Sequence, residues 1–126
     1  MSQTVAELVA EASSQIDNLD PDRAARELAD GALVVDIREA HERAANGAIP
    51  GTLHIPRGLL EFNADPAHPL HVADFDPARR TVLYCASGGR SALGVLALQQ
   101  LGYRNVAHLA GGMKAGVDAG RSVTAD

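Results

Sequence analysis

The only cysteine of the chain, Cys85, opens a short loop of small residues that ends in an arginine, with the sequence Cys-Ala-Ser-Gly-Gly-Arg over 85–90. Because glycine adopts backbone angles closed to other residues, the N–H groups of such a loop can turn inward around a single anion. A helix that starts directly after the loop adds the positive end of its dipole. Both effects favour the thiolate, which is the nucleophilic form of cysteine. A cysteine that only fills the core needs neither the glycines nor the arginine, so the pattern predicts a reactive thiol.

The segments on either side of Cys85 place it at the edge of a predicted sheet. We expect strands at 32–37, 53–55, 81–84 and 106–109, and helices at about 3–16, 23–29, 39–45, 57–62, 91–101 and 113–119. Strands that alternate with helices form an open parallel sheet with helices on both faces. We therefore predict one α/β domain over residues 1–126, with four or five strands. Cys85 follows the strand 81–84, at the carboxyl end where such sheets bind ligands.

The composition agrees with this fold and argues against several classes of partner. Apolar residues make up 46% of the chain, aromatic residues only 3%, and there is no Trp, so the core must consist of small aliphatic side chains. The net charge of −5 argues against a nucleic acid or an anionic membrane as partner. A single cysteine excludes an internal disulfide and suits a reducing compartment. With no long apolar run and no basic, apolar N-terminus, we expect a cytoplasmic protein.

The histidines give no pattern typical of a metal site. The five are His41, His54, His68, His71 and His108. Only His68 and His71 are close in sequence, and no second pair or cysteine has ligand spacing. We therefore expect no metal and no cofactor. His54 and His108 fall in predicted strands and are expected to pack in the core or at its rim.

Three segments of the chain resemble one family, the rhodanese-like sulfurtransferases. The loop 85–90 resembles the active-site loop of that family. Residues 33–56, with a strand followed by Asp36, Arg38 and Glu39 and then by Ile-Pro-Gly, are similar to its opening motif. Residues 102–112, which end in Leu-Ala-Gly-Gly, resemble a third motif. The resemblance covers residues 33–112 in the order and spacing of the family.

The resemblance implies a sulfurtransferase in which Cys85 carries sulfur as a persulfide. The sulfur would come from a small donor, thiosulfate or a persulfide, and pass to cyanide or to a thiol, free or on a protein. The sulfur would be bound by the loop, whose remaining residues are Ala86, Ser87, Gly88, Gly89 and Arg90. We expect a monomer or a homodimer.

Several charged residues have two interpretations. Arg90 faces the bound anion, or it lies behind the loop and pairs with a carboxylate such as Asp36 or Glu42; we favour the second, because a buried carboxylate needs a partner. Asp36, Arg38 and Glu42 are assigned structural support of the loop. Arg57 is expected to be a solvated loop cation.

Two other functions use related folds. Cdc25-type phosphatases and arsenate reductases have one more residue between cysteine and arginine, which widens the loop for a tetrahedral oxyanion. Here four residues intervene, so we expect no phosphatase activity. The alternative to catalysis is a protein-binding or sulfur-sensing module, but such rhodanese-like domains often lack the cysteine.

The chain also departs from the family pattern at positions that bear on the donor. Thiosulfate-using members carry cations where this chain has Ala86 and Ser87, and an arginine where it has Glu42. Fewer cations attract a dianion more weakly, which favours a persulfide or polysulfide donor. Many members have Trp where this chain has Gly116, so we expect the last helix to pack loosely or differently.

Overall fold

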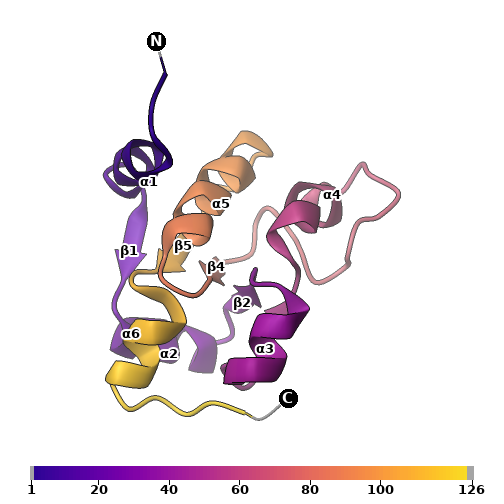
Figure 1. Ribbon diagram of the computed structural model, residues 1–126. Coiled ribbons are helices and arrows are strands. Elements are labelled where there is room, and N and C mark those ends of the chain that lie inside the picture. The colour runs from indigo at the N-terminus through magenta and orange to yellow at the C-terminus, as the bar shows by residue number, and fades with distance from the viewer. Residues whose placement is uncertain (1, 125–126) are drawn as a thin grey trace.

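The computed structural model describes residues 2–124 as an α/β domain with a five-stranded sheet (Figure 1). The elements in chain order are α1 (Val5–Ser13), β1 (Asp17–Leu19), α2 (Pro21–Ala29), β2 (Leu33–Asp36), α3 (Ala40–Asn46), β3 (Leu53–His54), the 3₁₀ helix η1 (Arg57–Leu59), α4 (Leu60–Ala64), β4 (Thr81–Tyr84), α5 (Gly89–Gln100), β5 (Val106–Leu109) and α6 (Gly112–Asp118).

The strands follow the order β1-β5-β4-β2-β3, and every neighbouring pair is parallel. The predicted open parallel sheet is therefore confirmed, with the larger of the two expected strand numbers. β4 lies at the centre of the sheet and leads directly into Cys85. Sequence analysis missed β1, an edge strand of three residues with only Leu19 buried.

Side chains alternate along the strands between two cores. Val35 and Leu83 contribute, with Cys85, to the core covered by α4 and α5. Val34 and Val82 contribute to the opposite core, covered by α2 and α6. Helices thus cover both faces, as predicted, and the parity of each strand residue decides which core it joins.

The first two helices begin with side-chain caps that the sequence encodes. Asp20 accepts the N–H of Arg23 at 2.8 Å, and Pro21 occupies the first helical position. α1 ends at Ser13, earlier than predicted, because the side-chain amide of Asn18 binds the carbonyls of Ser13 and Ile16. This contact turns the chain from α1 into β1.

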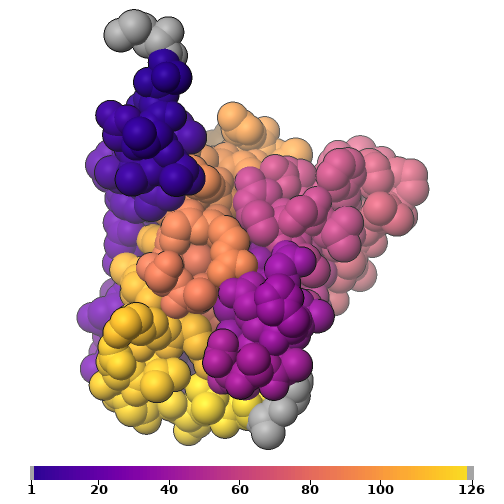
Figure 2. Space-filling model, in the orientation of Figure 1, coloured from indigo at the N-terminus to yellow at the C-terminus, as the bar shows by residue number. Residues whose placement is uncertain are grey.

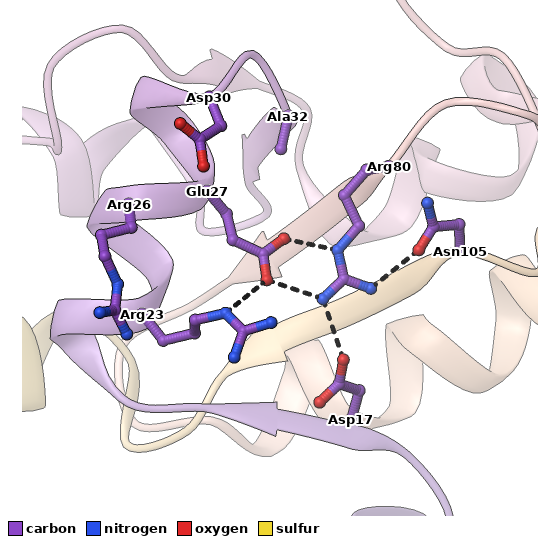
Figure 3. Close-up of a pocket in the computed structure, with 8 residues that line it drawn as sticks. All are labelled: Asp17, Arg23, Arg26, Glu27, Asp30, Ala32, Arg80 and Asn105. Atoms are coloured by element: carbon purple, nitrogen blue, oxygen red, sulfur yellow. Dashed lines mark hydrogen bonds and ion pairs between the residues drawn. The ribbon is translucent and has the colours of Figure 1, made fainter.

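The amino-terminal ends of the strands are joined by ion pairs around Arg80. Its guanidinium donates to Glu27 of α2 at 2.6 Å, to Asp17 of β1 at 2.9 Å and to Asn105 before β5 at 3.1 Å (Figure 3). These residues line an open hollow of about 730 Å³. The hollow lies at the end of the sheet away from Cys85, and the groups in its centre already bind one another. We assign it a structural role. None of the helices within residues 2–124 is long and apolar enough to cross a membrane.

Candidate active site

The Cys85 side chain lies at the base of the predicted loop. Its Sγ accepts the N–H of Gly88 at 3.1 Å, and only 1% of the residue is exposed. Gly88 has a φ of +106°, in the region that favours glycine, and an added Cβ would meet the backbone nitrogen of Gly111 at 3.2 Å. Glycine at this position lets the loop turn an amide toward the sulfur.

The first turn of α6 holds the loop from behind. Met113 and Lys114 donate their backbone N–H groups to the carbonyls of Cys85 and Ala86, at 2.8 and 3.1 Å. Gly112, with a φ of +60°, lies so close that an added Cβ would come within 2.5 Å of the Cys85 carbonyl oxygen. The glycine at 112 thus allows the backbone of α6 to approach that of the loop closely. The carbonyls of Cys85 and Ala86 are thus bound by α6. The N–H groups at the start of α5 have no partner within their own helix and can donate to an anion at Cys85.

Arg90 pairs with Glu42 of α3, one of the two carboxylates named as its possible partners. Its two terminal nitrogens donate to the two carboxylate oxygens at 2.7 and 2.8 Å. Hydrogen bonding from Arg90 lowers the pKa of Glu42 to about 2. The pKa of Arg90 is raised, mainly by Glu42 and to a smaller extent by the charge of Cys85. Arg90 therefore braces the loop against α3 and still acts electrostatically on the sulfur.

Asp36 and Arg38 form a buried ion pair beneath the loop. Asp36 accepts from the Arg38 side chain at 3.0 and 2.8 Å, from Arg43 at 3.0 Å and from the Tyr84 hydroxyl at 3.1 Å. Burial opposes ionisation of Asp36, but the hydrogen bonds from Arg38 outweigh it and lower its pKa. Arg38 also donates to the carbonyl of Gly47 at 2.8 Å. These contacts join β2 to α3, to the residue that follows α3 and to β4, and the support of the loop expected of both residues stays a prediction.

Sequence reasoning missed a second set of side chains near the sulfur. The Cys85 thiol donates to the hydroxyl of Ser91 at 3.6 Å, and that hydroxyl lies 2.8 Å from Nδ1 of His108. Nε2 of His108 lies 2.7 Å from Oδ1 of Asn18. His108 is buried, as expected, but it binds this chain of polar groups. The position of His108 could have been inferred, because side chains alternate along a strand and His108 shares the face of Val106, which α5 covers. The position of Asn18 could not, because it lies in β1, a strand that the sequence did not predict.

A groove leads to Cys85 from the surface. It measures about 590 Å³ and is lined on one side by α1 and on the other by the loop and α5; its residues are Val5, Ala6, Val9, Ala10, Cys85, Ser87, Gly89, Arg90 and Leu93. In Figure 2 the orange surface that includes the loop and the start of α5 is exposed between α1, α3 and α6. α1 packs on α5. The groove therefore has a largely apolar wall.

The remaining candidates lie apart from the loop or serve local contacts. Arg57 pairs with Glu61 one turn later, at 2.7 Å. His68 packs edge-on against the Phe62 ring, and His71 bonds to the carbonyl of Phe75. Within residues 2–124, no three His, Cys, Asp or Glu side chains are grouped to hold a metal ion.

Comparison with known proteins places this geometry in a family. The sequence profile of the rhodanese-like domain matches residues 20–119. A solved structure from Rhodopseudomonas palustris, described as a protein of unknown function and possible tyrosine phosphatase, is 35% identical; the match covers 98% of this chain and 96% of that chain, with a TM-score of 0.91. None of the curated proteins matches the chain.

Two further solved structures share the fold. A rhodanese-related protein from Thermoplasma volcanium is 24% identical over 87% of this chain and 99% of that chain, with a TM-score of 0.72. A rhodanese-like domain protein from Staphylococcus aureus is 26% identical over 86% and 99%, with a TM-score of 0.68. The profile match extends over most of the chain and includes the cysteine loop, the buried Asp36–Arg38 pair and the glycines behind the loop. This chain belongs to the rhodanese-like domain family.

Proposed function

We propose that the protein is a sulfurtransferase that carries a sulfur atom as a persulfide on Cys85. The observation that supports this most directly is the hydrogen bond from the Gly88 N–H to Cys85 Sγ at 3.1 Å. It orients an amide donor toward Sγ, where the negative charge of the thiolate resides; in the persulfide the charge lies one bond further out, on the outer sulfur, within reach of the other loop amides. The start of α5 at Gly89 adds favourable dipole charge at the same point.

In the first step, the Cys85 thiolate attacks the outer sulfur of the donor. A bond forms between Sγ and that sulfur as the sulfur–sulfur bond of the donor breaks. The bonding electrons leave with the remainder of the donor, a thiolate from a persulfide or sulfite from thiosulfate. The enzyme is left as Cys85–S–S⁻, whose charge the loop amides stabilise.

In the second step, an acceptor thiolate or cyanide attacks the outer sulfur of the Cys85 persulfide. The new bond forms to the acceptor, the sulfur–sulfur bond to Sγ breaks, and its electrons return to Sγ. Cys85 is restored as a thiolate without a change in the overall redox state of the protein.

The groove before Cys85 supports a persulfide donor over thiosulfate. Val9 of α1 and Leu93 of α5 contribute apolar wall. Arg90 is the one cationic residue among the described residues that line the groove, and Glu42 neutralises its charge. A doubly charged donor gains little attraction there, whereas the organic part of a persulfide gains apolar contact.

Mass spectrometry of the intact protein tests the proposal. After incubation with an organic persulfide, and separately with thiosulfate, we expect a gain of one sulfur atom on Cys85, larger with the persulfide. Cyanide or a thiol should remove it, and Cys85→Ser should never acquire it. Absence of the adduct with every donor, in a protein that binds a specific partner, would leave the non-catalytic binding module as the better account.

The same protein should be assayed with an aryl phosphate, because a similar structure is described as a possible tyrosine phosphatase. Two observations argue against that activity here. Only four residues separate Cys85 from Arg90, and the Arg90 guanidinium binds Glu42. Hydrolysis that is abolished by Cys85→Ser would refute the sulfurtransferase assignment in favour of a phosphatase.

A further inference from the structure

Four side chains from four segments of the fold form one continuous path from the reactive sulfur to the surface. Cys85 follows β4, Ser91 lies in α5, His108 in β5 and Asn18 in β1. The three links measure 3.6 Å from Sγ to the Ser91 hydroxyl, 2.8 Å from that hydroxyl to His108 Nδ1, and 2.7 Å from Nε2 to Asn18 Oδ1. His108 and Asn18 are register partners on adjacent parallel strands.

The contacts of Asn18 fix the direction of every hydrogen bond in this path. Its side-chain nitrogen donates to the carbonyls of Ser13 and Ile16, at 2.9 and 3.1 Å. The oxygen that faces His108 can therefore only accept, so Nε2 must carry a proton. In a neutral imidazole the other nitrogen, Nδ1, is then an acceptor. Ser91 donates its single proton to Nδ1 at 2.8 Å rather than to the Gly88 carbonyl, which lies farther away at 3.3 Å, and turns a lone pair toward the Cys85 thiol.

Burial keeps the imidazole of His108 in its neutral form while Cys85 is a thiol. His108 is 2% exposed, and burial lowers its pKa, so the ring is neutral at neutral pH when Cys85 is a thiol. Around it lie Asn18 from β1, Cys85 from β4 and Ser91 from α5. The charged group that acts on Cys85 is Arg90, with Glu42 from α3 bound to it.

We propose that Ser91 and His108 form a proton relay, oriented by Asn18, that generates the Cys85 thiolate. The thiol proton passes to the Ser91 oxygen as the Ser91 proton passes to Nδ1, which gives a thiolate, a neutral hydroxyl and an imidazolium. Nδ1–H then donates to Ser91, and Ser91 donates to the thiolate. Ser91 contacts the reacting sulfur; His108 and Asn18 act through it as positioning residues. The use of this thiolate in sulfur transfer rests on the function proposed above.

The ultraviolet thiolate band, followed against pH, measures this step without a sulfur donor. Cys85 is the only cysteine, so Cys85→Ser gives the baseline. Burial raises the pKa of Tyr103 to about 12 and raises that of Tyr84 as well, which keeps tyrosinate absorbance out of the neutral range. We expect the midpoint of the thiolate signal to move up by about one pH unit in Ser91→Ala and in His108→Asn.

The choice of variants separates proton acceptance from simple hydrogen bonding. An asparagine at 108 can accept the Ser91 proton in a hydrogen bond but cannot become protonated. Asn18→Ala, at an exposed position, should shift the midpoint less and in the same direction, and with Ser91→Ala it carries the test if His108→Asn does not fold. His71→Asn is the matched control, because His71 bonds to a backbone carbonyl away from the loop; its midpoint should equal that of the wild type.

The outcomes distinguish the relay from the proposed function. Equal midpoints in the wild type, Ser91→Ala and Asn18→Ala overturn the relay, even if the wild type acquires sulfur from a donor. Shifted midpoints support the relay, and they do so even if no donor loads Cys85, in which case the sulfurtransferase proposal alone fails.

Discussion

Two glycines on the same short helix have opposite surroundings. Gly112, at the start of α6, has no room for a side chain, because a Cβ would lie 2.5 Å from the carbonyl oxygen of Cys85. Gly116, one turn later, is buried, yet a Cβ there would meet nothing within 4 Å. It borders an apolar hollow of about 260 Å³, which also reaches Leu28 of α2 and Tyr84 of β4.

The difference shows where close fit matters in this fold. At the carboxyl end of the sheet, the backbone of α6 and the Arg90–Glu42 ion pair hold the cysteine loop, which opens toward the groove. Beneath the far half of α6 the core is incomplete, at the position where many rhodanese-like domains carry a Trp. We infer that the geometry of the loop depends on the first turn of α6 and tolerates a loosely filled core behind it.

Gly112→Ala should have the largest effect, since it places a methyl group against the backbone of the loop and a non-glycine residue at positive φ. We expect a loss of about 3 kcal/mol or more in the free energy of unfolding. Sulfur loading of Cys85 should fall with it. Denaturant unfolding and mass spectrometry measure the two effects. Gly102→Ala is the control: its φ is +94° but a Cβ there meets nothing within 4 Å, so it should cost only about 1 kcal/mol. Equal losses would contradict the close-fit interpretation.

Asp36→Asn removes the charge that neutralises Arg38, a side chain that is 1% exposed. An unpaired buried guanidinium should lower the free energy of unfolding by about 3–5 kcal/mol. Denaturant unfolding at neutral pH is the measurement. Asp118→Asn, which breaks the exposed pair with Lys114, should change stability by less than about 0.5 kcal/mol. A small effect of Asp36→Asn would mean that the ion pair is dispensable to this end of the sheet.

Glu42→Gln tests the partly exposed ion pair between Glu42 and Arg90. It should lower the free energy of unfolding by about 1 kcal/mol at neutral pH. Because the folded-state pKa of Glu42 is about 2, below its ordinary value of 4.5, the stabilisation is complete above about pH 4.5 and is lost as the pH falls toward 2. Denaturant unfolding of both proteins between neutral pH and about pH 3 should therefore show a difference that shrinks with acid. If the difference in unfolding free energy between the two proteins grows as the pH falls, the Arg90–Glu42 ion pair does not stabilise the folded state in this way.

Gly116→Ala should have the smallest effect and the opposite sign. An alanine in a helix interior with open space around it should raise the free energy of unfolding by about 0.5–1 kcal/mol. Gly94→Ala is the matched comparison, because in α5 a Cβ meets Leu83 Cδ1 at 2.9 Å and Leu60 Cδ2 at 3.2 Å. That change should destabilise by about 1–3 kcal/mol. Thermal unfolding of the two variants measures both effects. If Gly116→Ala is less stable than the wild type, the hollow beside Gly116 is not free space.

The ion pair beside the loop, Arg90 with Glu42, could be predicted from the sequence. The path of uncharged groups from Ser91 through His108 to Asn18 could not. Arg90 follows from a motif, and Glu42 from the need of Arg90 and of a nearby partly buried carboxylate for one another. Ser91 and His108 look like core residues until strand order brings them together. Asn18 lies in a three-residue edge strand with a single buried side chain, which leaves no periodicity to detect. The close approach of Gly112 is a long-range packing feature that local propensity does not encode.

The segment before residue 20, where the family profile begins to match, has a practical consequence. α1 supplies a wall of the groove and β1 supplies Asn18. A fragment cloned to the family boundaries would keep the motif residues, lose the far end of the hydrogen-bonded path and bare the surface of α5 that α1 covers. Measurements on such a fragment would describe an incomplete domain.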